Sequence, residues 1–289
     1  MLPNPNNFKK IILITGATSG IGKEAAKSLA ILNYHLVLVG RNEEKTKLVA
    51  QEIKNLSNNP QIDYLIADLS LLNEVKKLAN NFSTKYTHLD VLINNAGGVN
   101  QKKTITSEGL ELTFALNHLS YFYLTDLLLD SLKNSQSARI VNVSSAAHKT
   151  GQVDFANLQG EKSYSSFISY AKSKLENILF TNKLSRFLVG TKITVNALHP
   201  GRVNTNFGKQ SKAGLIWKIL SLFFSFGAIT PAEGSKTIAY LASSDEVEGV
   251  SGKYFYKNQA METSKQAKDI QAQDKLWQIS LDIIKKVVG

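Results

Sequence analysis

The amino-acid sequence predicts an α/β protein with a doubly wound parallel sheet, folded as a single domain. Short apolar runs alternate with longer amphipathic stretches along most of the chain, which is typical of repeated strand–helix units. The apolar runs are nearly continuous, as expected for strands that helices cover on both faces. No linker, repeat or low-complexity segment divides the 289 residues, so one domain is expected over 1–289.

The first half of this pattern contains three expected strands, each followed by a helical stretch. Parallel strands need a crossover of this length between them, and a helix usually supplies it. The strands are expected at 11–14, 35–39 and 63–67, and their helices at 21–32, 43–56 and 71–82.

The second half continues the alternation and adds two further features. A variable substrate-loop insertion is expected near 202–230, and a C-terminal helix at 264–288 closes the domain. The remaining strands are expected at 90–93, 139–143 and 192–198, with helices at 112–132 and 167–188.

Composition narrows the classes of function. The chain is 43% apolar and 20% charged, which is ordinary for a globular protein with a large core. There is no cysteine, which excludes disulfides and thiolate metal sites, and the five histidines show no ligand spacing, so no metal is expected. The net charge of +11 comes from lysines spread along the chain, which favours a generally basic surface over a nucleic-acid site.

The sequence also bears on location. The start of the chain has no apolar core before Ile11, so no secretory signal is expected. No window is long and apolar enough for a spanning helix, and a cytoplasmic protein is predicted. The apolar segment 215–226 leaves three alternatives: a lid over a lipid-like substrate, a peripheral contact with a membrane, or a helix packed on the body or on a second subunit.

A glycine-rich turn follows the first strand and opens the first helix, within 15–22. Glycines allow a tight turn and close backbone approach, and a helix N-terminus offers free N–H groups to a pyrophosphate. This position predicts a dinucleotide site that involves Gly16, Ser19, Gly20, Ile21 and Gly22.

The end of the second strand predicts which dinucleotide binds. A cofactor with a free ribose 2′-hydroxyl usually meets an acid here, but Arg41 and Asn42 follow the strand instead. The planar guanidinium of Arg41 can pair with a 2′-phosphate. NADP(H) is therefore preferred to NAD(H).

The next two strands end in residues suited to the same edge of the sheet. Asp68 and Leu69 follow the third strand, where the adenine is expected to lie. The run 94–97 follows the fourth strand. Its amides can join adjacent strands, and the small Ala96 and Gly97 leave room for a cofactor beside Asn94.

Tyr170 and Lys174 carry the strongest chemical signal. Residues four apart lie on one face of a helix, and a nearby ammonium lowers the pKa of a phenol, whose ordinary value is near ~10. The pair therefore predicts a proton-transfer device. Ser144 and Ser145 end the fifth strand, and Asn117 lies in the helix before it. A serine hydroxyl and the Asn117 amide could together hold a substrate carbonyl near Tyr170.

These features together resemble the classical short-chain dehydrogenases/reductases, which share a Rossmann fold. The resemblance covers about residues 9–260 and rests on the glycine turn, the run 94–97, the Ser145–Tyr170–Lys174 order and His199-Pro200-Gly201. Three stretches are similar to the retinol dehydrogenase branch of that family: 116–119, 157–162 and 174–180.

The resemblance implies roles for particular residues. Tyr170 would be the general acid in carbonyl reduction, Lys174 would lower its pKa and hold the nicotinamide ribose, Ser145 would orient the carbonyl, and Asn117 would hold a water that relays protons. The segment against the nicotinamide would consist of Pro200, Gly201, Val203 and Thr205. The family often pairs subunits through the helix of Tyr170, so a homodimer is expected.

The predicted function is an NADPH-dependent oxidoreductase for an apolar aldehyde or ketone, or for the matching alcohol. Two alternatives stay open: a nucleotide-binding sensor or scaffold without turnover, and a membrane-surface lipid-binding protein. Asn117, Ser145, Tyr170 and Lys174 favour the enzyme, because a pure binding module has no need of all four.

Overall fold

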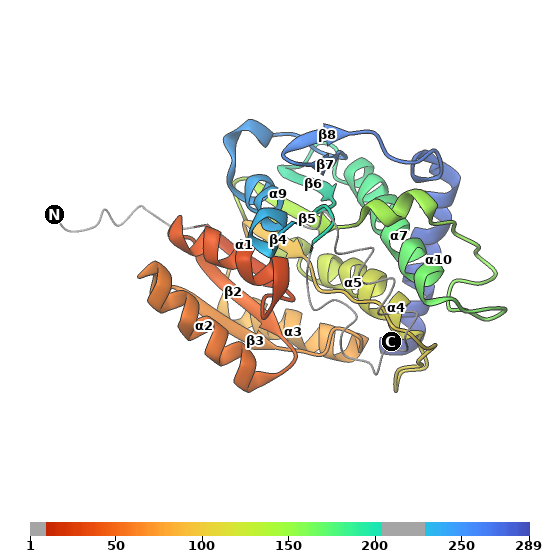
Figure 1. Ribbon diagram of the computed structural model, residues 1–289, viewed down its shortest axis with the longest axis horizontal. Coiled ribbons are helices and arrows are strands. Elements are labelled where there is room, and N and C mark those ends of the chain that lie inside the picture. Colours follow the sequence, from red (N-terminus) through yellow and green to blue (C-terminus); the bar gives the residue numbers. More distant parts are fainter. Residues whose placement is uncertain (1–9, 204–228) are drawn as a thin grey trace.

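Eight strands form one sheet at the centre of the molecule (Figure 1). The computed structural model describes residues 10–203 and 229–289. The strand order is β3-β2-β1-β4-β5-β6-β7-β8, and every neighbouring pair is parallel except β7 and β8. The strands are β1 (Ile11–Thr15), β2 (His35–Gly40), β3 (Ile62–Ile66), β4 (Val91–Asn94), β5 (Ala138–Val143), β6 (Ile193–Leu198), β7 (Tyr254–Tyr256) and β8 (Gln259–Met261).

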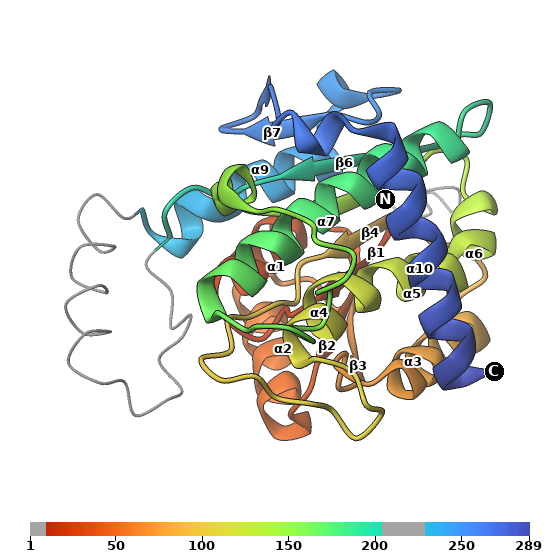
Figure 2. The same cartoon turned by 90° about the vertical axis from the view of Figure 1, so that its right-hand side faces the viewer.

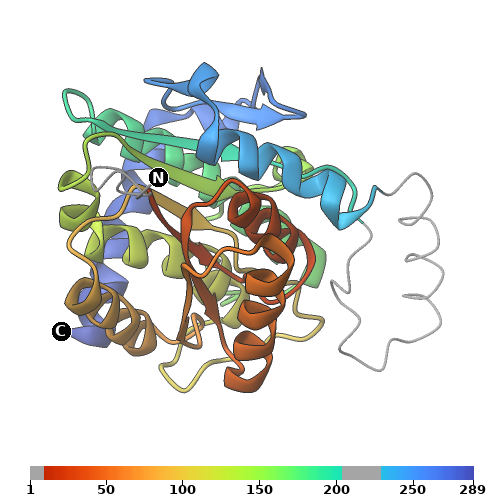
Figure 3. The same ribbon diagram turned by 90° about the vertical axis from the view of Figure 1, so that its left-hand side faces the viewer.

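Helices cover both faces of this sheet. Helices α1, α2 and α9 lie on one face, which Figure 3 shows from its own side, and α3, α5, α7 and α10 lie on the other (Figure 2). Their bounds are α1 (Gly20–Ile31), α2 (Glu43–Ser57), α3 (Leu72–Lys85), α4 (Leu112–Phe114), α5 (Ser120–Leu127), α6 (Leu129–Lys133), α7 (Ser166–Phe187), α9 (Pro231–Ser243) and α10 (Ile270–Val288).

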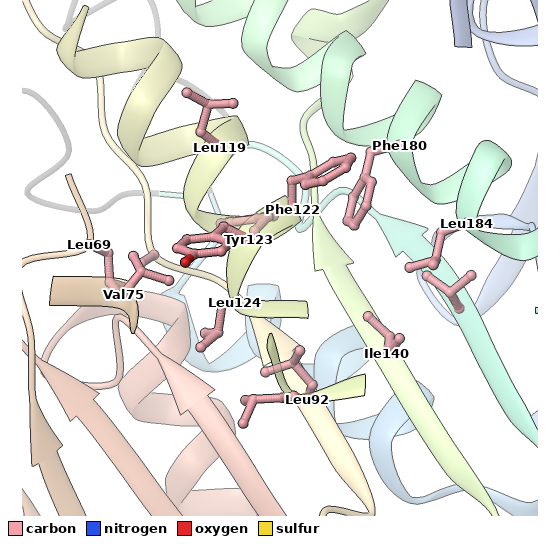
Figure 4. Close-up of a cluster of buried hydrophobic side chains, with 14 of the residues drawn as sticks. Leu69, Val75, Leu92, Leu119, Phe122, Tyr123, Leu124, Ile140, Phe180 and Leu184 are labelled. Atoms are coloured by element: carbon pink, nitrogen blue, oxygen red, sulfur yellow. The ribbon is translucent and has the colours of Figure 1, made fainter. Parts of the chain in front are cut away.

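Successive strand residues point into two separate cores, because side chains alternate across a sheet. Leu13, Leu92 and Ile140 face the helices α3, α5 and α7. Their neighbours Ile12 and Ile93 face α1, α2 and α9. Figure 4 shows Leu92 and Ile140 beneath aromatic side chains of the first of these cores. The continuous apolar runs of the sequence follow from this double burial.

The predicted fold class is confirmed, and the expected strands agree with the observed ones within one or two residues. The expected helix 112–132 consists of α4, a π-helical turn η1 (Ala115–Leu119), α5 and α6. The C-terminal helix begins at Ile270, because a 3₁₀ turn (Gln266–Lys268) and the cap of Asp269 precede it.

Three elements of the described chain were not expected. β7 and β8 are only three residues long, too short for a periodic signal. Helix α9 did have a recognisable start, because Thr230 caps it and Pro231 occupies its first turn. Most of the expected insertion 202–230, including the segment 215–226 and Thr205, lies outside the described residues.

The strand order places the binding edge. β1 pairs with both β2 and β4, so the chain winds in opposite directions from this point. Ligands of open α/β sheets bind beyond the carboxyl ends of the strands at such a reversal. The loops after β1, β4, β5 and β6 meet there, and they carry most of the predicted site residues.

Helix α10 packs against α7 and α3 (Figure 2). Its Trp277 ring lies 4.7 Å from Phe122 and 5.8 Å from Phe187, centroid to centroid. The expected pairing of subunits through α7 stays a prediction, and α10 occupies one side of that helix. Within the described part of the chain, no helix is long and apolar enough to cross a membrane.

Candidate active site

The glycine turn after β1 is built for close backbone packing. Gly16 and Gly20 have φ of +65° and +56°, a region that other residues rarely adopt. A Cβ on Gly16 would lie 2.8 Å from the Ala96 Cα, so no side chain fits there. Ser19 precedes α1 without a side-chain cap, and the first turn of α1 contains no acidic residue. The turn therefore presents amide groups to an anion at the edge of the sheet.

Asn95 and Thr15 hold this turn against β4. The Asn95 Nδ2 donates to the carbonyl oxygens of Thr15 at 2.9 Å and Gly16 at 3.2 Å. The Thr15 Oγ1 accepts from the backbone nitrogens of Asn95 and Ala96. The expectation that amides of the 94–97 run join adjacent strands is confirmed. Asn95 itself was not predicted as a site residue, although it belongs to that run.

Arg41 and Asp68 come together at the ends of β2 and β3. Arg41 Nη1 lies 3.7 Å from Asp68 Oδ2, and the Arg41 side chain is 69% exposed, free to contact a ligand at the edge. The other carboxylate oxygen of Asp68 accepts from the backbone and side chain of Ser70. The Asn42 side chain caps α2 by accepting from the Lys45 backbone nitrogen at 2.8 Å. The oxygen of its side-chain amide is thus already used within the fold.

Two predicted cofactor contacts have buried side chains. Asn94 is fully buried, and its Nδ2 donates to Thr125 Oγ1 and to Asn142 Oδ1 on β5. Leu69 is 5% exposed and belongs to the core over α3 (Figure 4). In this structure both side chains hold the strands and helices that form the edge. Only the backbone of these two residues remains for a direct contact with a cofactor.

The segment after β6, the start of α1 and helix α9 pack closely together around Gly234 of α9. A Cβ on Gly234 would lie 2.6 Å from Val203 Cγ2, 3.1 Å from Ile21 Cγ2 and 3.4 Å from the Pro200 oxygen. Gly201 has a φ of +91°, and its nitrogen donates to His199 Nδ1 at 3.2 Å. The structure therefore brings the predicted residues of both halves of the sheet to one edge.

Tyr170 and Ser145 face each other at the end of β5. Tyr170 lies in the second turn of α7, and its phenol hydrogen-bonds with the Ser145 hydroxyl. Burial raises the pKa of Tyr170 above its ordinary value, and the hydrogen bond with Ser145 opposes that shift. The Ser145 Oγ also accepts from the Ala147 nitrogen at 3.2 Å. A carbonyl oxygen near both hydroxyls would meet two hydrogen-bond donors.

Lys174 lies one helical turn from Tyr170, with its ammonium 5.7 Å from the Tyr170 ring centroid. Its Nζ donates to the Val143 carbonyl at 3.0 Å. Burial lowers the pKa of Lys174 to about 7. The expected lowering of the Tyr170 pKa by this lysine is not present here, because burial raises the pKa of Tyr170 and lowers that of Lys174, and each shift disfavours the charged form.

Asn117 lies in the middle of the π-helical turn, a geometry that is frequent at functional sites. Its Nδ2 donates to the Gly98 oxygen and to Ser173 Oγ, and its Oδ1 accepts from the Gly98 nitrogen. A Cβ on Gly97 would lie 3.1 Å from Asn117 Oδ1 and 3.4 Å from Lys174 Nζ. The absence of a side chain at Gly97 therefore leaves a cradle beside Lys174 that suits a cofactor.

Two further side chains support the site by holding its elements together. The Ser144 hydroxyl donates to the Lys174 carbonyl at 2.6 Å, so Ser144 joins α7 to the end of β5. Its only proton is used in this hydrogen bond. The buried His148 Nδ1 lies 2.8 Å from the Ser145 carbonyl and 3.2 Å from the Tyr254 hydroxyl. A contact between the 3₁₀ turn after β5 (Ala146–Thr150) and the distant β7 has no local sequence signal.

Glu176 is a buried acid on the same helix. It is fully buried, and neither of its carboxyl oxygens has a hydrogen-bond partner among the described residues. Burial raises the pKa of Glu176 from 4.5 to about 8; Lys172 opposes this shift and Glu111 adds to it. The side chain is therefore expected to stay protonated at neutral pH.

The free energy of unfolding should fall as pH rises from 4.5 to 8, because unfolded chains release the Glu176 proton in this window and folded chains keep it. In Glu176→Gln the fall in the free energy of unfolding over this pH range should be smaller by an amount on the order of 2–4 kcal/mol. Urea unfolding of both proteins at pH 5 and pH 8 measures this difference. The exposed Glu44→Gln serves as control, and equal pH dependence in all three proteins would contradict a high pKa for Glu176.

Comparison with known proteins agrees with this geometry. The family model for short chain dehydrogenases matches residues 10–215. Retinol dehydrogenase 11 from Homo sapiens is 40% identical over 275 residues, covering 95% of this chain and 86% of the relative. Retinol dehydrogenase 14 from Homo sapiens is 40% identical, with 94% and 85% covered. Polyprenol dehydrogenase from Homo sapiens is 37% identical, with 97% and 86% covered.

Solved structures share the fold over a similar extent. An uncharacterized protein from Mycobacterium paratuberculosis superposes with a TM-score of 0.77 at 29% identity, covering 97% of this chain and 95% of that one. A short chain dehydrogenase from Shigella flexneri, solved in complex with NADP, gives 0.65 at 26% identity, with 85% and 95% covered. The chain therefore belongs to the short chain dehydrogenase family of nicotinamide-dependent oxidoreductases, and it is similar to the retinol dehydrogenases within it.

Proposed function

We propose that the protein is an NADPH-dependent oxidoreductase that interconverts an apolar aldehyde or ketone and the matching alcohol. The observation that carries this proposal is the hydrogen bond between Tyr170 and Ser145, one helical turn from the buried ammonium of Lys174. These groups adjoin the Gly97 cradle, where a Cβ would meet both Asn117 and Lys174. A binding protein without turnover would gain nothing from burying a lysine beside this tyrosine and serine.

In the reducing direction, Tyr170 donates its phenolic proton to the carbonyl oxygen of the substrate. Ser145 donates a second hydrogen bond to the same oxygen and orients it. Bound NADPH supplies the hydride for the carbonyl carbon. Lys174 would hold the nicotinamide ribose and, when protonated, would favour the phenolate that Tyr170 becomes. In the oxidising direction Tyr170 is the base.

Cofactor binding is assigned to the edge of the sheet. The turn of Gly16, Ser19 and Gly20 and the first amides of α1 at Ile21 and Gly22 would hold the pyrophosphate. The segment after β6 would hold the nicotinamide. Asn117 is assigned a water that passes protons to Lys174. The adenosine and nicotinamide contacts are assigned to Arg41, Asn42, Asp68, Leu69, Asn94, Ala96, Gly97, Pro200, Gly201, Val203 and Thr205.

An apolar substrate is supported by the relatives. Retinol and polyprenols, named in the relatives, are long apolar alcohols. On the described surface, Phe167 and Ile168 in the first turn of α7 are 51% and 61% exposed, a few residues before Tyr170. Such side chains next to the reacting groups would favour a hydrocarbon chain.

A series of aldehydes of increasing chain length should test this substrate class. Each added methylene that is buried contributes about 0.8 kcal/mol, so kcat/KM should rise about threefold to fourfold per carbon until the binding surface is filled. NADPH absorbance follows the reaction, and a matched series of sugars and hydroxy acids serves as the polar control. Turnover of the polar series alone would contradict an apolar substrate.

The preference for NADPH depends on Arg41. Arg41→Ala should raise the dissociation constant of NADPH about 10- to 100-fold, the effect of losing a charged hydrogen-bonding partner, and should change NADH binding little. Fluorescence titration measures both constants. Lys54→Ala, in the last turn of α2, removes the same charge elsewhere and serves as control. Equal losses for the two cofactors in Arg41→Ala would refute the 2′-phosphate contact.

A further inference from the structure

His118 is a buried residue of the π-helical turn that the proposed mechanism does not use. It is fully buried, directly after Asn117, and its Nε2 lies 3.0 Å from the Ser280 Oγ of α10. The Ser280 hydroxyl also lies within hydrogen-bonding distance of the Leu276 carbonyl, at 2.8 Å. Either the imidazole or the hydroxyl can donate in the His118–Ser280 contact, depending on the tautomer, and the His118 ring also hydrogen-bonds with the Asn177 side chain.

Aromatic packing encloses this hydrogen bond. The His118 ring lies 5.4 Å from Phe114 and 6.3 Å from Phe180, centroid to centroid. Trp277 of α10 packs on Phe122 and Phe180, which Figure 4 shows side by side. Burial lowers the pKa of His118 to about 3, so the ring stays neutral and keeps a single N–H donor near neutral pH.

The backbone around His118 leads directly to the active site. The oxygen and the nitrogen of the Asn117 side-chain amide both hydrogen-bond with the Gly98 backbone, and the nitrogen also donates to Ser173 Oγ of α7. A π-helical turn contains one residue more than an α-helical turn, so side-chain contacts must stabilise it against conversion to a regular helix. A shift of that turn would move Asn117 relative to Lys174, which flanks the same cradle at Gly97.

We propose that His118 and Ser280 are positioning residues through which the C-terminal helix α10 fixes the π-helical turn and places Asn117 beside Lys174. Neither residue touches the reacting groups. α10 thus acts as a support of the active site, in addition to covering the outer side of α7. The inference rests on the proposed function, because Asn117 is taken to act in proton transfer to Lys174.

The test compares Ser280→Ala with Ile284→Val, which removes a methyl group from a buried residue of α10 one turn further on. Both changes should cost stability of about 1 kcal/mol. Ser280→Ala alone should lower kcat about tenfold, with NADPH affinity unchanged. It should also speed hydrogen exchange at the Gly98 amide, because that amide donates its hydrogen bond to Asn117 Oδ1. His118→Gln, which retains an N–H donor, should stay closer to wild type than His118→Leu.

Failure of this inference and failure of the proposed function can be told apart. If Ser280→Ala and Ile284→Val lower the melting temperature alike and leave both kcat and Gly98 exchange unchanged, the contact is only structural and the inference is wrong. Failure of the proposed function looks different. In that case the wild-type protein shows no turnover with any substrate, while Gly98 exchange still reports whether Ser280 holds Asn117.

Discussion

Replacing Tyr170 by phenylalanine is expected to lower turnover about 10²- to 10⁴-fold while NADPH binding stays close to normal. The substitution removes only the hydroxyl, so the ring still packs beside Lys174 and the fold is preserved. What is lost is the proton donor and the hydrogen bond with Ser145. Single-turnover reduction of an aldehyde and fluorescence titration of NADPH measure the two quantities separately.

Tyr121→Phe is the matched control for this experiment. Tyr121 is also buried beside Lys174, whose ammonium lies 5.6 Å from the Tyr121 ring centroid. Its hydroxyl has no hydrogen-bond partner among the described residues. Removing that hydroxyl should leave turnover near that of the wild type. Tyr170 has no part in the mechanism if Tyr170→Phe turns over as fast as Tyr121→Phe.

Lys174→Met is expected to lose both cofactor affinity and turnover. The ammonium is assigned to the nicotinamide ribose and to the phenolate form of Tyr170, so kcat/KM should fall about 10²- to 10⁴-fold. NADPH should bind about tenfold or more weakly, the effect of losing a charged hydrogen bond. This loss of binding distinguishes the lysine variant from Tyr170→Phe. Titration calorimetry with NADPH and initial rates provide the two readouts.

The stability of Lys174→Met separates loss of function from loss of fold. Burial lowers the pKa of Lys174 to about 7, which means that the fold disfavours the charged form. Methionine has a similar volume and no charge, so the melting temperature should stay unchanged or rise. A variant that melts normally and binds NADPH with wild-type affinity would contradict the role of Lys174 at the ribose.

The local parts of the site could be predicted from the sequence because each follows from short-range spacing. The glycine turn must lie between β1 and α1, and Tyr170 and Lys174 must share a face of α7. The alternation of apolar strands and helices likewise determined the doubly wound sheet. Burial was harder to predict: Asn94 ends β4 and Leu69 follows β3, beside the less buried Asn95 and Asp68, yet their side chains pack inside the sheet layers.

Long-range contacts account for what the sequence could not reveal. The π-helical turn at Asn117, the contact of His148 with Tyr254 and the cover of α7 by α10 join residues that are far apart in the chain.

By itself, then, the sequence determined the alternation of the first six strands with their helices, the phosphate turn and the tyrosine–lysine pair, because these depend on local spacing and on periodicities of two and 3.6 residues. Only the tertiary structure decided the titration of the site. The pKa values of Tyr170 and Lys174 depend on how completely the surrounding layers exclude water, and no local spacing encodes that burial.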